Sequence, residues 1–132
     1  GFCQTPGREG LCLGILPCQG EGEWTPPPGY PNPYVEIPIQ THLWLSGTQG
    51  ESLASRNSIN ILSSDAIVVL HGQAGTISEA RLAQRAGRPV ALFLPLQILA
   101  KAKEQLEALQ LEPLTELTQL DAWFNEVLMP SP

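Results

Sequence analysis

One glycine-bearing segment, His71-Gly72-Gln73-Ala74-Gly75-Thr76, carries the clearest chemistry in the 132-residue chain. It follows an apolar run, Ala66 to Leu70, and precedes helical spacing from Thr76 to Arg85. A strand, a turn and a helix start, in that order, bring unpaired main-chain N–H groups and the positive end of a helix dipole to one point. The glycines permit unusual backbone angles and close approach to the main chain, and the threonine adds a hydroxyl donor. The segment therefore predicts a loop that binds phosphate.

The same residues allow a second interpretation. Thr76 and Glu79 have the spacing of a capping box, in which the threonine hydroxyl accepts a hydrogen bond from the main-chain N–H three residues later and the glutamate reaches back. Many helices begin this way without binding a ligand. The loop by itself gives no preference between ligand binding and plain capping.

The loop and its surroundings resemble the LOG-like Rossmann proteins of the SLOG superfamily. His71 to Glu79 is similar to their Pro-Gly-Gly-x-Gly-Thr-x-x-Glu motif, and Arg56 lies nine residues before Asp65, as in their Arg-Lys pair ahead of a Ser-Asp and strand. Two further segments are similar to their Gly-Lys-Pro-Val and Gly-Ile-Leu-Pro sequences: Ala86-Gly87-Arg88-Pro89-Val90 and Leu13-Gly14-Ile15-Leu16-Pro17. The resemblance extends from about Gly10 to Leu94.

This group includes molybdenum cofactor carrier proteins and nucleoside 5′-monophosphate phosphoribohydrolases, which are often misnamed lysine decarboxylases. His71 and Gln73 replace the proline and second glycine of the motif, and Asn57 stands where the hydrolases have lysine. The Arg56-Asn57 pair resembles the carrier branch. The resemblance thus implies a carrier for a phosphorylated nucleotide- or pterin-like ligand, with the molybdenum cofactor (molybdopterin) as a candidate. It places that ligand on His71, Gly72, Gln73, Ala74, Gly75 and Thr76, with Arg56 and Asn57.

The alternative that the resemblance implies is a phosphoribohydrolase. Glu79 would then stabilise the oxocarbenium ion that forms at the ribose, because a fixed carboxylate offsets positive charge in the transition state, and Arg56 would orient the nucleotide. The three replacements favour binding over turnover. Two residues keep other interpretations: Arg56 as a salt-bridged helix residue, and His71 as a histidine packed under the loop instead of a ligand contact.

The elements that must position these residues alternate along the chain. Apolar runs predict four strands: Leu11–Leu16, Tyr34–Ile39, Ala66–Leu70 and Pro89–Leu94. Helical spacing predicts four helices: Gly50–Ser63, Thr76–Arg85, Gln97–Leu109 and Thr115–Leu128. Pro38 places the second strand near an edge, the third is expected at the centre, and Gly87 ends a helix in a left-handed conformation. The order predicts an α/β fold, a Rossmann-like parallel sheet flanked by helices, as a single domain over residues 1–132. From the resemblance we expect that the family's first βαβ unit, with its own glycine-rich loop, is lacking.

The amino-acid composition limits the classes of partner that we expect for this protein. Thirteen acidic residues against seven basic ones, only two of them lysines (Lys101 and Lys103), argue against nucleic-acid binding. No apolar run approaches the roughly 20 residues of a membrane-spanning helix, and no signal peptide is recognisable, so we expect a cytoplasmic protein. Cys3, Cys12 and Cys18 lack zinc-site spacing and are expected to be free, mostly buried thiols, with no metal site. The resemblance also implies a homo-oligomer, a dimer or a tetramer.

Overall fold

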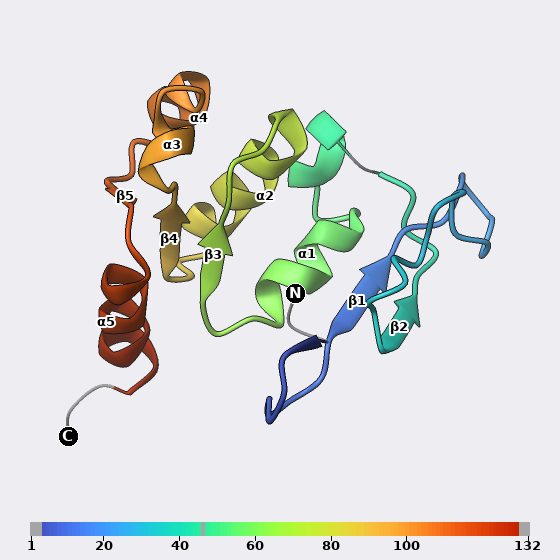
Figure 1. Cartoon of the computed structure of the whole chain (residues 1–132). Coiled ribbons are helices and arrows are strands. Elements are labelled where there is room, and N and C mark those ends of the chain that lie inside the picture. Colours follow the sequence, from blue (N-terminus) through green and yellow to red (C-terminus); the bar gives the residue numbers. More distant parts are fainter. Residues whose placement is uncertain (1–3, 46, 130–132) are drawn as a thin grey trace.

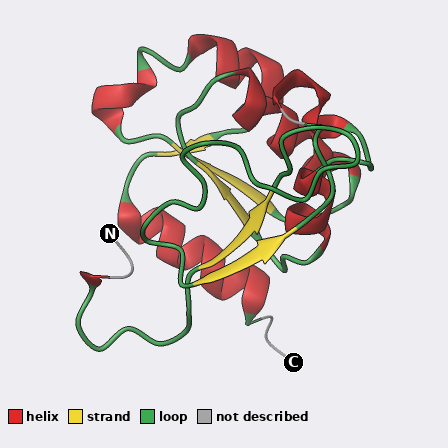
Figure 2. Ribbon diagram, turned by 90° about the vertical axis from the view of Figure 1, so that its right-hand side faces the viewer, coloured by secondary structure: helices red, strands yellow, loops and turns green. Residues whose placement is uncertain are grey.

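The chain forms parallel strands flanked by helices, in a computed structural model that describes residues 4–45 and 47–129 (Figure 1). The strands are β1 (Leu13–Leu16), β2 (Ile37–Gln40), β3 (Ile67–Val69), β4 (Val90–Phe93) and β5 (Pro113–Leu114). The helices are α1 (Arg56–Leu62), α2 (Ala74–Arg85), α3 (Leu96–Leu99), α4 (Lys103–Leu109) and α5 (Leu117–Leu128), with a 3-10 helix, η2 (Gly47–Glu51). Figure 2 shows helices on both sides of the strands, which confirms the predicted α/β, Rossmann-like class.

The strands form two parallel sheets. One pairs β1 with β2, and the other has the order β3-β4-β5. The expectation that the third strand is central is wrong within the described residues, because β3 pairs with β4 alone. The N–H of Ile67 donates to Pro89 O at 2.9 Å, so Val68 directs its N–H and C=O toward the open edge. Apolar composition predicts that a strand is buried, but it does not show whether both edges are paired.

Helix α2 is central to the core. One buried cluster packs it against β3, β4 and α4, and a second cluster packs it against α1. The predicted inner face of α2 is confirmed, because Ile77, Ala80, Leu82 and Ala83 are all buried. Each buried isoleucine or leucine stabilises the fold by about 1.5–3 kcal/mol, so the core holds the start of α2 in place. The helix ends as predicted, with Gly87 at a φ of 67°.

The predicted helix over 50–63 is wrong in its first half. Residues 47–51 form η2, and α1 begins only at Arg56. The cause is Ser55, whose hydroxyl donates to Gly50 O at 2.8 Å and accepts from the Asn57 N–H at 3.1 Å, as an N-cap does. Leu53 lies before this cap and is 74% exposed, so it is not on a buried helix face.

The C-terminal third differs from the prediction in two ways. The helix expected over 97–109 is interrupted between α3 and α4, and Ala102 and Gln105 both lie in the interior at 2% exposure. The predicted pattern also omits β5, whose two residues are too few to show periodicity. This strand is nevertheless fixed by pairing with β4 and by a hydrogen bond from the Leu94 N–H to Leu114 O at 2.8 Å.

The other expectations concern cysteines and membrane spans. Cys18 is buried and Cys12 half-buried, and both are free thiols, while Cys3 lies outside the described residues. Among the residues with described placement, no helix has the length and apolar character needed to cross a membrane.

Candidate functional site

The glycine loop leads directly into α2. This helix begins at Ala74, two residues before the predicted start, and Gln73 is its N-cap, without a side-chain capping bond. Thr76 is therefore the third residue of the helix, and the capping-box interpretation of Thr76 and Glu79 is wrong. The physical reason is that the Thr76 side chain packs back over Gly72, as the contacts around that glycine show.

The first turn of α2 presents unpaired main-chain donors. The first helical hydrogen bond runs from the Ile77 N–H to Gln73 O at 3.1 Å. Within the described part of the chain, the N–H groups of Ala74, Gly75 and Thr76 have no acceptor, as expected for a helix start that lacks a capping side chain. These donors and the helix dipole together favour an anion.

Gly72 is required by a close approach and not by its backbone angles. A Cβ at this position would lie 2.1 Å from Thr76 Oγ1 and 2.6 Å from Thr76 Cβ, so only glycine fits beneath that side chain. Neither Gly72 nor Gly75 has a positive φ. The expectation of special backbone angles in the loop is therefore wrong.

Gln105, which the sequence does not single out, holds the loop through hydrogen bonds from a neighbouring helix. The side chain of Gln105, in α4, accepts from the Gly72 N–H at 3.2 Å and donates to Leu70 O at 2.9 Å. These bonds close both sides of the turn between β3 and α2. The Gly72 amide is thus already satisfied, and the free donors begin at α2. A glutamine in an amphipathic helix gives no sequence signal for such a role.

Arg56 and Glu79 meet at the side of α2. Arg56 is the first residue of α1, and its Nη2 lies 4.0 Å from Glu79 Oε1. Their side chains are 20% and 32% exposed, so the pair is shielded but reachable. Burial raises the pKa of Glu79 above its ordinary value of 4.5, and the Arg56 guanidinium lowers that pKa in part. The Arg56 Nε is buried without a hydrogen-bond partner, which leaves a donor beside this carboxylate.

Thr76 and Glu79 lie one turn apart on α2 and line the same cavity of about 240 Å³. The cavity follows β3 from Ala66 to Leu70 and includes Asn60 of α1. Thr76 and Glu79 therefore line one cavity that reaches the carboxyl end of β3 at Leu70, and Arg56 lies beside Glu79. That end is where open α/β sheets bind their ligands.

The remaining loop residues face a different cavity. His71, Gly72, Gln73 and Ala74 line a space of about 410 Å³ that also includes Lys101 and Gln105. His71 is exposed, so the interpretation of a histidine packed under the loop is wrong. The loop thus separates two cavities, and the free donors of α2 lie at their junction.

Asn57 is buried at 3% exposure and contacts residues other than the loop. A Cβ at Gly50 would lie 2.3 Å from Asn57 Nδ2 and 3.3 Å from Ser78 Oγ, so η2, α1 and α2 meet closely there. Asn57 Oδ1 and Ser78 Oγ are both buried without a hydrogen-bond partner. Buried polar atoms ordinarily have a hydrogen-bond partner, so the junction of η2, α1 and α2 holds two unsatisfied polar groups.

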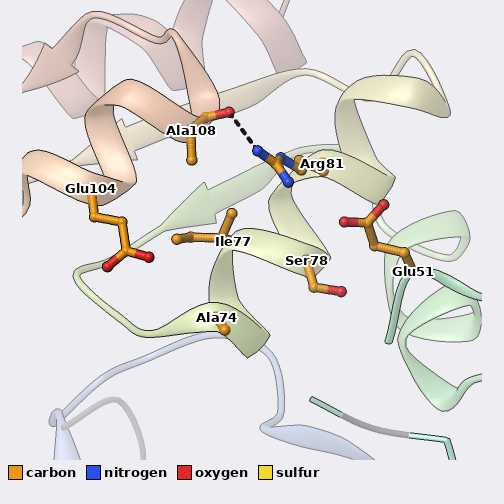
Figure 3. Close-up of a pocket in the computed structure, with 7 residues that line it drawn as sticks. All are labelled: Glu51, Ala74, Ile77, Ser78, Arg81, Glu104 and Ala108. Carbon is orange, nitrogen blue, oxygen red and sulfur yellow. Dashed lines mark hydrogen bonds between the residues drawn. The ribbon is translucent and has the colours of Figure 1, made fainter. Parts of the chain in front are cut away.

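A cavity on another face of α2 has the wrong charge for an anion. It measures about 330 Å³, and Figure 3 shows Glu51 and Glu104 on opposite sides of the Ile77 and Ser78 side chains. Its one cation, Arg81, donates to Ala108 O at 3.4 Å. Glu51 is also paired with Arg85 at 2.5 Å, so the charges around this cavity balance and give no net positive charge to attract phosphate.

Comparison with known proteins agrees with the resemblance seen in the motifs. Among the described residues, no group of three or more histidine, cysteine, aspartate or glutamate side chains is arranged to hold a metal ion. No curated protein and no solved structure matches the chain. A family model described as the SLOG cluster4 family matches residues 5–120, which include the loop, Arg56 and Glu79. The chain belongs to the SLOG cluster4 family.

Proposed function

We propose that this protein binds a phosphorylated nucleotide- or pterin-like ligand at the start of α2. The main support for this proposal is that three main-chain N–H groups, at Ala74, Gly75 and Thr76, have no acceptor within the described residues. They lie at the positive end of a 12-residue helix, where the dipole favours negative charge. Gln105 holds the turn in place, so binding does not require the loop to reorganise.

The pair on the side of α2 suits the remainder of such a ligand. Glu79 lies one helical turn beyond Thr76, so a phosphate at the free amides places the sugar or ring portion beside Glu79 and Arg56. The positive charge of Arg56, beside Glu79, favours an anionic ligand. The Arg56 guanidinium, 4.0 Å from Glu79, partly offsets the repulsion between this carboxylate and an anionic ligand.

The donor set fits a monophosphate group, which nucleotides and molybdopterin share, and it does not discriminate between their ring systems. We propose a carrier role because Asn57 stands where the hydrolases of the wider group have lysine, and this side chain is buried at 3% exposure. In a carrier role, molybdopterin would be the transported ligand and not a cofactor of the protein. Fluorescence of pterin released from the purified protein by heat distinguishes this ligand from a nucleotide.

Calorimetric titration with adenosine 5′-monophosphate tests phosphate binding, with adenosine as the control that lacks only the phosphate. We expect saturable binding of the monophosphate alone. Arg56→Ala should weaken that binding about tenfold, because a charge-assisted contact contributes about 1.4 kcal/mol or more. Arg81→Ala removes the same charge from another face of α2 and should leave affinity unchanged. Equal binding of adenosine and its monophosphate would contradict a phosphate site.

A phosphoribohydrolase is the second candidate, favoured by the contact between Arg56 and Glu79 and by the raised Glu79 pKa. A raised pKa makes a carboxyl group a better proton acceptor than an ordinary glutamate, which favours a role in general acid–base catalysis. In this reaction water cleaves adenosine 5′-monophosphate into adenine and ribose 5-phosphate. Chromatographic detection of adenine, lost in Glu79→Gln and kept in Glu104→Gln, would establish turnover. Binding without adenine release would establish the carrier role.

A further inference from the structure

A separate cavity of about 450 Å³ lies among the segments that follow β1 and β2. Its aromatic wall is formed by Trp24 from the segment after β1 and by His42 and Trp44 from the segment after β2. The rings of Trp24 and His42 are in contact, with centroids 5.5 Å apart and planes inclined by 48°. The phosphate site described above uses none of these residues.

Hydrogen bonds hold the segment that carries Trp24. The Gln19 N–H donates to Thr25 O at 2.9 Å, and the Gln19 side chain donates to Pro26 O at 3.1 Å, so residues 19–26 form a closed loop. The Cys18 N–H donates to Leu43 O at 3.1 Å and joins this loop to the segment that carries the other two rings. The aromatic wall is therefore preorganised and does not require a ligand to assemble it.

Exposure and charge indicate which ligand this cavity selects. Trp24 and Trp44 are 63% and 42% exposed, so two large indole rings remain in contact with water. Glu21 is the one charged residue lining the cavity. An indole face attracts cations through its quadrupole, and a neighbouring carboxylate adds to that attraction, whereas an anion is repelled by both.

We propose that this aromatic cavity binds a small alkylated ammonium group, such as a quaternary ammonium. Trp24 and Trp44 supply the ring faces, and Glu21 supplies the counter-charge. The preference for a cation is opposite to that of the loop at α2, so the protein has two sites of opposite charge selectivity. Loss of phosphate binding would leave this site intact.

Titration with choline, followed by tryptophan fluorescence, tests the proposal. Trp123→Phe removes the indole of α5, so the signal comes from Trp24 and Trp44. Sodium chloride replaced mole for mole by choline chloride keeps the ionic strength constant. We expect a saturable change with a Kd of about 1 mM, and binding of 3,3-dimethylbutan-1-ol, the uncharged isostere, about tenfold weaker.

Three single-residue variants test which side chains form the choline site. Glu21→Gln changes an exposed side chain, so it leaves folding unaffected, and it should weaken choline binding about three- to tenfold. Trp24→Ala and Trp44→Ala should each abolish saturation, with saturation-transfer NMR of the choline methyl groups as a readout independent of the indoles. Equal binding of choline and its neutral isostere, an unchanged affinity in Glu21→Gln, or the absence of saturable binding would each overturn the proposal.

Discussion

Replacing Gly72 by alanine tests how the phosphate loop is held. The added Cβ would lie 2.1 Å from Thr76 Oγ1, 2.6 Å from Thr76 Cβ and 3.0 Å from Thr76 Cγ2. Real Cβ atoms essentially never approach another atom within 3.0 Å, so Thr76 and the first turn of α2 must move. Overpacking of this kind costs about 1–3 kcal/mol. We expect Gly72→Ala to lower the free energy of unfolding by that amount and to weaken binding of adenosine 5′-monophosphate.

Urea denaturation of the single and double mutants tests whether the contact with Thr76 causes the loss of stability in Gly72→Ala. Thr76→Ala removes Oγ1 and Cγ2, two of the three nearest atoms, so Gly72→Ala should cost about 1 kcal/mol less in that background. Gly20→Ala is the matched control, because nothing lies within 4 Å of its added Cβ and its φ is not left-handed. Its effect should stay within about 0.5 kcal/mol. An equal cost of Gly72→Ala in both backgrounds would refute the assigned contact.

Three further variants test the surroundings of the loop. The pKa of Glu79 is raised in the folded state, so the folded protein binds this proton more tightly than the unfolded chain does. The resulting stabilisation is fully present below pH 4.5 and is lost as the pH rises through the folded pKa. Glu79→Gln should remove this part of the pH dependence, measured as melting temperature from pH 4 to about pH 8, and an unchanged profile would contradict the raised pKa. Gln105→Leu leaves the Gly72 N–H and the Leu70 carbonyl unpaired, so we expect faster hydrogen exchange at Gly72 and a free energy of unfolding lower by about 1–3 kcal/mol. Unchanged protection of the Gly72 amide would contradict the role of Gln105 in holding the loop. Ser55→Ala removes the cap of α1, and urea denaturation should show a loss of about 1–2 kcal/mol, whereas no loss would mean that the cap is dispensable.

The sequence predicts well those features that depend on local patterns. The apolar face of α2, the end of this helix at Gly87 and the loop between an apolar strand and a helix all follow from spacing and residue type. Arg56 and Glu79 were named as a pair through the family motif, and the structure brings them within 4.0 Å. A motif preserves such a pairing because both residues lie at fixed distances from a recognisable loop.

Features that depend on tertiary contacts are not predictable in this way. Gln105 lies 33 residues from Gly72 along the chain, and only the packing of α4 beside the loop brings its side chain to the Gly72 N–H. Ser55 caps α1 by reaching back to Gly50, which divides a stretch with an adequate helical pattern. Thr76 fits a capping motif by sequence, yet packing over Gly72 directs its side chain elsewhere. In each case a specific contact outweighs local propensity.

Amide NMR of the ¹⁵N-labelled protein, titrated with adenosine 5′-monophosphate, tests phosphate binding at α2 most directly. We expect the amides of Ala74, Gly75 and Thr76 to shift most, because they would donate to the phosphate. Adenosine at the same concentrations should leave these three signals in place. Shifts centred instead on Arg81, Glu104 and Ala108, or no shift in the first turn of α2, would contradict phosphate binding by these amides.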